Sequence, residues 1–151
     1  FDKLTEASDN LRRSLSPKLS EDASRFMEAA SDGSYDRLLV DEGLKLRFLS
    51  EGSAHDAASF SSGTADLAYI SLRLALIRLL YDEKEDKLPP LIFDESFVRL
   101  DDRRLSAILK VVAAYGAQVF LLTCHRREGR ILHEVTAYTE LHLPVKSNET
   151  V

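Results

Sequence analysis

The sequence predicts an α/β domain with a small, mostly parallel sheet, flanking helices and a β-hairpin. Two short apolar runs, at residues 91–93 and 117–123, have the pattern of strands that are buried on both faces in a parallel sheet. Apolar residues between these runs recur every three or four positions, which predicts a helix that connects two parallel strands. Apolar and polar residues alternate on either side of Asp41-Glu42-Gly43, which predicts the hairpin.

Length and composition indicate one domain of an ordinary globular protein. The chain has 151 residues, enough to bury a core, and its net charge of −5 lacks the basic footprint of a nucleic-acid-binding surface. The single cysteine, Cys124, excludes an internal disulfide and suits a reducing compartment. No apolar run is long enough to span a membrane, and we find no signal-peptide pattern. We therefore expect a cytoplasmic protein without a membrane partner. Because the chain begins at Phe1, we also expect it to be a fragment of a longer protein.

Residues 1–33 predict two helices. In 1–15 the apolar positions follow a short heptad seam, and spacing alone favours an amphipathic helix on its own domain over the end of a coiled coil. Ser16 and Pro17 then predict an interruption, with Ser16 as the N-cap of a second helix that stops near Gly33. The seam residues are Phe1, Leu4, Ser8, Leu11 and Leu15, and the buried stripe predicted for the second helix is Leu19, Ala23, Phe26 and Ala30.

Four further segments carry little chemistry. Residues 52–59 are small and polar and predict a loop, in which His55 is a solvated side chain rather than a metal ligand. Residues 82–87 are charged and predict a solvated connection. Weak alternation at 138–143 predicts a last strand, and 146–151 reads as a tail.

A candidate anion site lies at the start of a long helix. Apolar residues recur at helical spacing from Leu67 to Tyr81, and the helix is preceded by small residues. A helix N-terminus presents N–H donors and a positive dipole end to anions, and a glycine there permits close approach. In isolation, an ordinary serine or threonine N-cap is the simpler interpretation. The small residues are Ser61, Ser62, Gly63 and Thr64.

A second candidate site lies at the carboxyl ends of the two predicted parallel strands. Asp94 and Glu95 follow the first strand, and Cys124 and His125 follow the second. Such strand ends meet at one edge of a sheet, where open α/β folds place their ligand sites. One carboxylate can hold a divalent metal while the other orients or deprotonates a water. A solvated turn is the alternative interpretation of the two acids, and Asp101 or Asp102 is expected to cap the following helix.

Three stretches, taken in this order, resemble the C-terminal half of an ABC-type ATPase head, which is a P-loop NTPase. Phe60–Leu80 is similar to the signature motif, Leu91–Asp101 to the Walker B strand and D-loop, and Val119–Glu128 to the switch-histidine segment. The closest resemblance is to heads of the SMC, RecF and double-strand-break-repair class, including YhaN-like proteins. The resemblance implies a coiled-coil-like end at 1–15 and the C-terminal lobe of the head at 16–145.

The resemblance implies specific roles for the residues at the strand ends. Asp94 would anchor the shell of a Mg²⁺ ion, Glu95 would polarise the attacking water, and His125 would contact the terminal phosphate of ATP. The implied reaction is the hydrolysis of ATP to ADP and phosphate, which would drive DNA repair or chromosome maintenance in the full-length protein.

The resemblance also implies a homodimer of heads. Ser61, Ser62, Gly63 and Thr64 would bind the terminal phosphate of ATP held by the opposite head, and Asp101 would lie at the interface and couple the two sites. The signature departs from the usual pattern, because serine replaces its first glycine at 62 and threonine replaces glutamine at 64. A third departure is Phe60, which stands where leucine is usual, and together these favour the SMC-like branch over a transporter subunit.

The chain lacks the GxxxxGK[ST] motif that cradles phosphates, because none of its six glycines is followed by lysine. In the families that it resembles, this Walker A motif lies in an N-terminal lobe of the same protein. We therefore expect the fragment alone to be inactive, with that lobe, a second head and, through the full-length protein, DNA as partners.

Other functions remain open at this stage. The motifs could have decayed in a structural or interaction module, or the chain could belong to a transporter nucleotide-binding subunit. An unrelated enzyme could use Cys124 as nucleophile and His125 as base. The last is disfavoured, because adjacent residues on an extended segment point in opposite directions.

Overall fold

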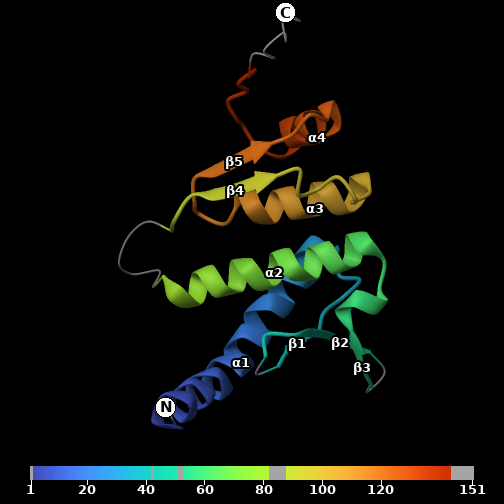
Figure 1. Cartoon of the computed structure of the whole chain (residues 1–151). Helices are drawn as coiled ribbons and strands as arrows, with labels where there is room; N and C mark the ends of the chain where they lie inside the picture. Colours follow the sequence, from blue (N-terminus) through green and yellow to red (C-terminus); the bar gives the residue numbers. More distant parts are fainter. Residues whose placement is uncertain (1, 42, 51–52, 82–87, 144–151) are drawn as a thin grey trace, which may run out of the picture.

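The computed structural model describes residues 2–41, 43–50, 53–81 and 88–143, with the backbone alone for 2–12 and Ser50. The elements stack from a small antiparallel sheet, through two long helices, to a pair of parallel strands and a last helix (Figure 1). They are α1 (Asp2–Ala30), β1 (Leu38–Val40), β2 (Leu46–Ser50), β3 (Ser53–Asp56), the 3₁₀ turn η1 (Ala57–Ser59), α2 (Ser62–Leu80), β4 (Leu91–Asp94), α3 (Asp102–Ala113), β5 (Val119–Leu122) and α4 (Arg126–Val135). The α/β class is confirmed. The predicted connection at 82–87 and the tail at 146–151 lie outside the described residues.

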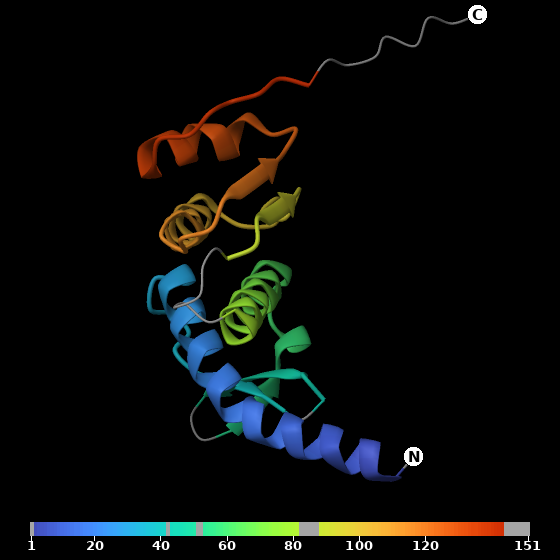
Figure 2. The same cartoon turned by 90° about the vertical axis from the view of Figure 1, so that its left-hand side faces the viewer.

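Helix α1 is continuous, so the predicted interruption at Pro17 is wrong (Figure 2). A proline inside a helix costs about 3 kcal/mol, because it removes one hydrogen bond and crowds the preceding turn. Packing offsets that cost, since Leu19, Ala23 and Ala30 are buried as predicted. Met27, which the sequence analysis did not single out, is also fully buried. Most of the predicted heptad seam lies before Arg13, where side chains are outside the description.

The predicted hairpin is confirmed and is extended by a third strand. Strands β1 and β2 pair antiparallel with Leu38 opposite Phe48, and β2 pairs in turn with β3. The prediction of a loop at 52–59 is therefore wrong. Every β3 side chain, including that of His55, is exposed, so the strand lacks the apolar alternation that a sequence reveals.

Serines of α1 fasten the hairpin to the helix. The N–H of Val40 donates to Ser20 Oγ at 2.9 Å, and the N–H of Leu38 donates to Ser24 Oγ at 2.9 Å. These bonds satisfy donors on the outer edge of β1, which would otherwise be available to another strand.

The parallel pair is confirmed. Strands β4 and β5 run parallel, with Leu91 opposite Val119 and Asp94 opposite Leu122. One face of the pair enters the core through Leu91 and Phe93, but the other face is open, with Ile92 68% exposed. The prediction that both faces are buried is therefore wrong for this chain by itself.

The predicted strand at 138–143 does not form. This segment pairs with no described strand and is attached to α4 at its start, where Tyr138 Oη donates to the carbonyl of Gly129. Leu141 and Leu143 beyond it are about four-fifths exposed, at 81% and 79%. Among the described residues, no helix combines the length and apolar character that crossing a bilayer requires.

Candidate functional site

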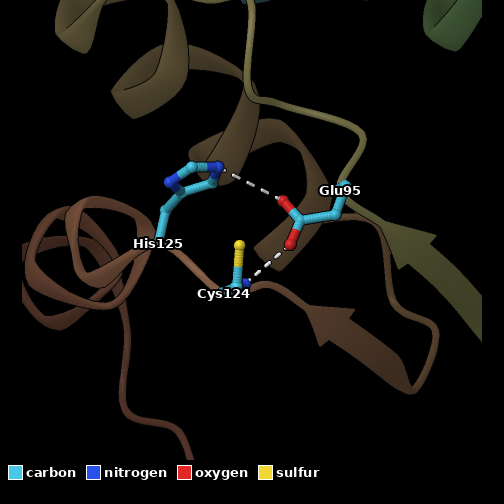
Figure 3. A group of neighbouring side chains, drawn as sticks. All are labelled: Glu95, Cys124 and His125. Atoms are coloured by element: carbon cyan, nitrogen blue, oxygen red, sulfur yellow. Dashed lines mark hydrogen bonds and ion pairs between the residues drawn. The ribbon is translucent and has the colours of Figure 1, made fainter.

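The carboxyl ends of β4 and β5 bring the predicted residues together. The strand ladder continues one residue past β4, because the N–H of Glu95 donates to the carbonyl of Leu122 at 3.0 Å. Asp94 and Glu95 therefore leave the sheet beside Cys124 and His125, as predicted. Figure 3 shows the Glu95 carboxylate facing both residues, with one oxygen toward the His125 imidazole and the other toward the main-chain nitrogen of Cys124.

Glu95 is held in an uncommon backbone conformation. Its φ of 46° lies in the left-handed region, which costs a non-glycine residue on the order of 1–3 kcal/mol. This turn directs the carboxylate to the end of β5, where Oε1 accepts a 2.7 Å hydrogen bond from the N–H of Cys124. That bond, together with a weaker one from the thiol, holds the pKa of the Glu95 carboxyl below its ordinary value. Glu95 is therefore fixed in place and ionised at neutral pH.

Cys124 and His125 do not point in opposite directions, so that expectation is wrong. The donor atoms of Glu95, Cys124 and His125 all lie within 4.8 Å of one another. Strand β5 has ended and the chain bends at Cys124, so the alternation of an extended strand no longer applies. His125 is the N-cap residue of α4, but its side chain does not cap the helix, and its Nε2 lies 3.6 Å from Glu95 Oε2.

The thiol is not arranged as a nucleophile. Hydrogen bonding to the Glu95 carboxylate, together with desolvation and the carboxylate charge, raises the pKa of the Cys124 thiol. An activated cysteine needs the opposite shift, which a neighbouring cation or helix N-terminus supplies. The alternative of a Cys124 and His125 nucleophile pair is thus opposed by the electrostatics of the site.

Asp94 is exposed, and its carboxylate has neither a hydrogen bond nor an ion pair with any described residue. An accessible carboxylate with free oxygens, next to a second one on Glu95, is the donor chemistry that suits Mg²⁺, which binds oxygen and retains several waters. The chemistry of these two side chains therefore fits such an ion.

The start of α2 is partly closed. Ser61 is the N-cap residue, and its Oγ accepts from the N–H of Thr64 and lies 2.9 Å from the Thr64 hydroxyl. Thr64 is 1% exposed, and Gly63 is buried against the main chain of Arg99. Ser62 is exposed. Its N–H and that of Gly63 have no acceptor among the described residues.

The segment between β4 and α3 is fastened at both ends. Arg99 forms a bidentate pair with Asp66 on α2, at 2.7 and 2.5 Å. On the other side, Arg127 of α4 donates to the carbonyls of Leu100 and Phe97, at 2.8 and 3.2 Å. Residues 96–101 therefore link the start of α2 to the start of α4.

Asp101 is the N-cap residue of α3, one of the two residues predicted for that role. Its carboxylate accepts from the N–H of Arg104 at 2.9 Å. Its side chain stays 57% exposed, so it caps the helix and still faces outward.

Glu128 is the one buried acid among the described residues, 1% exposed, and the Arg127 guanidinium lies 3.3 Å from it. Sequence analysis missed Asp66, Arg99, Arg127 and Glu128. Asp66 and Arg99 pair with each other across 33 residues of sequence, so no local spacing indicates the pair.

A groove of about 460 Å³ separates α2 from β4. Glu95 and Ser96 line it together with the Asp66 and Arg99 pair, and Ile92 and Val98 supply apolar surface. Glu95 and His125 lie together at the sheet edge, and Ser61 to Thr64 lie at the start of α2.

The chain is similar in sequence to known proteins. No protein-family model matches the chain. The uncharacterized protein YhaN of Bacillus subtilis is 30% identical over 123 residues, which are 78% of this chain and 12% of YhaN. The DNA replication and repair protein RecF of Prosthecochloris aestuarii is 31% identical over 83 residues, which are 54% of this chain and 22% of RecF. The chain thus spans less than a quarter of either relative.

Two solved structures share the fold. An Smc head domain of Pyrococcus furiosus, with an extended coiled coil and bound to the C-terminal domain of ScpA, aligns with a TM-score of 0.62 at 16% identity and covers 86% of this chain and 34% of its own. A structure from work on ATP-driven dimerization and DNA-stimulated activation of SMC ATPases has the same TM-score, 0.62, at 17% identity. The alignment covers 82% of this chain and 77% of the chain in that structure. The sequence similarity to YhaN and RecF and the fold shared with SMC head domains together support an SMC/RecF-like ABC ATPase head, C-terminal region, for this chain.

Proposed function

We propose that this chain supplies half of a composite ATP-hydrolysing site, completed by a Walker A lobe and by a second head. One observation carries the proposal. An ionised glutamate, Glu95, is fixed 3.6 Å from His125 at the edge of a parallel strand pair, beside the free carboxylate of Asp94. Phosphoryl transfer needs a group that orients the water and an acid that binds the metal, and His125 adds a side chain that can contact the phosphate.

The proposed roles follow from the contacts of each side chain. Glu95 polarises the attacking water through Oε2, because Oε1 is engaged by the N–H of Cys124. His125 contacts the terminal phosphate from its exposed position at the N-cap of α4. Asp94 holds Mg²⁺ through its free carboxylate, and the ion when bound neutralises phosphate charge.

The start of α2 is proposed to bind the terminal phosphate of ATP carried by the opposite head. The exposed Ser62 supplies the donors, and the helix dipole favours an anion there. Thr64 serves instead to hold the turn through Ser61. Asp101, exposed at the start of α3, lies on the segment that links the two sites and would couple them.

The Walker A lobe of the same protein is the proposed partner for the open face of β4 and β5. Ile92, Phe120 and Leu122 are 68%, 46% and 40% exposed on the parallel pair, whereas parallel sheets are ordinarily covered on both faces. The ATP cycle would then move attached coiled coils in DNA repair or chromosome maintenance. DNA would be contacted elsewhere, since the net charge of this chain is −5.

ATP turnover by this chain joined to a Walker A lobe tests the proposal. We expect Glu95→Gln to lower turnover by at least about 100-fold, because general-base catalysis contributes about 10²–10⁴. The variant should still bind ATP and dimerise. Glu140→Gln is the matched control, because Glu140 faces His142 at 3.5 Å outside the site. If Glu95→Gln turns over ATP like the wild type, the chain is a structural module whose motifs have decayed.

A further inference from the structure

The trio of Glu95, Cys124 and His125 offers one oxygen, one nitrogen and one sulfur to the same point in space. All three donor atoms lie within 4.8 Å of one another, and all three residues are exposed (Figure 3). The proposed ATPase chemistry uses the carboxylate and the imidazole and leaves the thiol without a role. The presence of a soft sulfur donor beside the other two groups is therefore not explained by the proposed ATPase chemistry.

The donor set suits zinc rather than magnesium. Thiolate, imidazole and carboxylate are the three side-chain ligands of Zn²⁺, with bonds of about 2.0–2.3 Å, and zinc binding to Cys124 breaks its S–H bond and releases the proton to solvent. Mg²⁺ binds oxygen ligands in an octahedral shell and does not favour sulfur ligands. Three protein ligands leave the fourth tetrahedral position for a water, as in open zinc sites.

The geometry requires only a small adjustment. Tetrahedral bonds of that length place neighbouring ligand atoms roughly 3.4 Å apart. Glu95 Oε2 and His125 Nε2 already lie 3.6 Å apart. The Cys124 sulfur lies within 4.8 Å of a donor atom of each of the other two residues, and rotation of its exposed side chain can bring it into the shell.

The carboxylate also has the outer-shell support that metal ligands require. Its other oxygen, Oε1, is fixed by the N–H of Cys124 at 2.7 Å, which orients Oε2 toward the imidazole. The backbone of the trio is held by the ladder bond from Glu95 to Leu122 and by the bond from the N–H of His125 to Thr123 Oγ1, at 3.0 Å each.

We propose that Glu95, Cys124 and His125 form a zinc-binding site, and that zinc bound there inhibits ATP hydrolysis by occupying the carboxylate and imidazole of the catalytic edge. The inhibitory part rests on the function proposed above, and the binding part does not. Zinc at the trio leaves Asp94 free for Mg²⁺, so excess magnesium does not displace it.

Zinc binding to the 151-residue chain is measured first, by competition with a chromophoric chelator in excess Mg²⁺. We expect one Zn²⁺ per chain, and an affinity at least about tenfold lower in Cys124→Ser and in His125→Gln, since even outer-shell changes cost about 10–100-fold. Co²⁺ as a probe should give a thiolate charge-transfer band that Cys124→Ser abolishes. His142→Gln is the matched control, because His142 faces a glutamate at 3.5 Å without a nearby thiol.

The outcomes separate the alternatives. Unchanged affinity in Cys124→Ser or His125→Gln, or no zinc binding at micromolar concentration, overturns the site, and a loss in His142→Gln would place the metal elsewhere. Circular dichroism checks the fold of each variant. Alkylation of Cys124 in the wild-type chain repeats the test without mutation, and it should weaken zinc binding equally.

The activity arm uses the chain joined to a Walker A lobe, and each variant is compared with itself with and without zinc. Zinc should suppress wild-type turnover, a zinc-selective chelator should restore it, and Cys124→Ser should be insensitive. Zinc that binds without inhibiting overturns the regulatory claim. If Glu95→Gln does not change ATP turnover, the proposed function is refuted and the zinc-binding result still stands. If turnover depends on Glu95 but the chain does not bind zinc, only this inference is refuted.

Discussion

Replacing Gly63 by alanine separates the packing role of this glycine from its proposed role in phosphate binding. A Cβ at this position would lie 2.8 Å from the main-chain oxygen of Arg99 and 3.5 Å from Cδ2 of Leu100. Ordinary contact begins at 3.4 Å, so the backbone of residues 96–100 or the start of α2 must move by about 0.6 Å. That segment is held on both sides by Asp66 and Arg127, so it cannot shift freely.

The magnitude follows from two opposing effects. Overpacking of this kind costs typically about 1–3 kcal/mol. The higher helix propensity of alanine stabilises the fold by less than about 1 kcal/mol, because Gly63 is only the second residue of α2. The free energy of unfolding should therefore fall by about 1–2 kcal/mol. Gly129 is the matched control, since a Cβ there meets nothing closer than Tyr138 Oη at 3.6 Å and should add about 0.5–1 kcal/mol.

Thermal and urea unfolding of the two variants, followed by circular dichroism, tests this difference. The gap of about 1.5–3 kcal/mol corresponds to roughly 3–12 °C in Tm for a chain of this size. Equal stability of Gly63→Ala and Gly129→Ala would refute the packing argument. If Gly63→Ala kept its stability and lost ATP-dependent dimerisation, phosphate approach would be the main reason for the glycine.

Two further predictions concern the residues around the strand ends. Arg127→Ala should lower the free energy of unfolding by about 2 kcal/mol, because it leaves the Glu128 carboxylate buried without its cation, whereas exposed Arg126→Ala should change it by less than about 0.5 kcal/mol. The alkylation rate of Cys124 should increase with pH, and the midpoint of that increase should lie at a higher pH than for a free thiol. The reason is that the hydrogen bond to Glu95 raises the pKa of the Cys124 thiol. Glu95→Gln should move that pH profile downward, and an unmoved profile would contradict the assignment.

The strand ends were predictable from sequence for a simple reason. Two short apolar runs, which end in acids at 94–95 and in Cys124-His125, predict buried strands. Parallel pairing of these strands brings their carboxyl ends to one edge. The cap of α3 by Asp101 was equally local, because an N-cap bond spans only three residues. Strand β3 and the continuous α1 were not predictable, since the first lacks an apolar face and the second depends on packing that offsets Pro17.

The sequence by itself determined which residues are candidates for the proposed chemistry, because residue types and their positions after strands and before helices are local properties. Tertiary structure alone decided how they are arranged. The left-handed turn at Glu95, the bend at Cys124 and the burial of Gly63 under Arg99 depend on contacts between segments about 30 residues apart. Such contacts leave no periodic signal, since the free energy that enforces them comes from packing and hydrogen bonds formed only after the chain has folded.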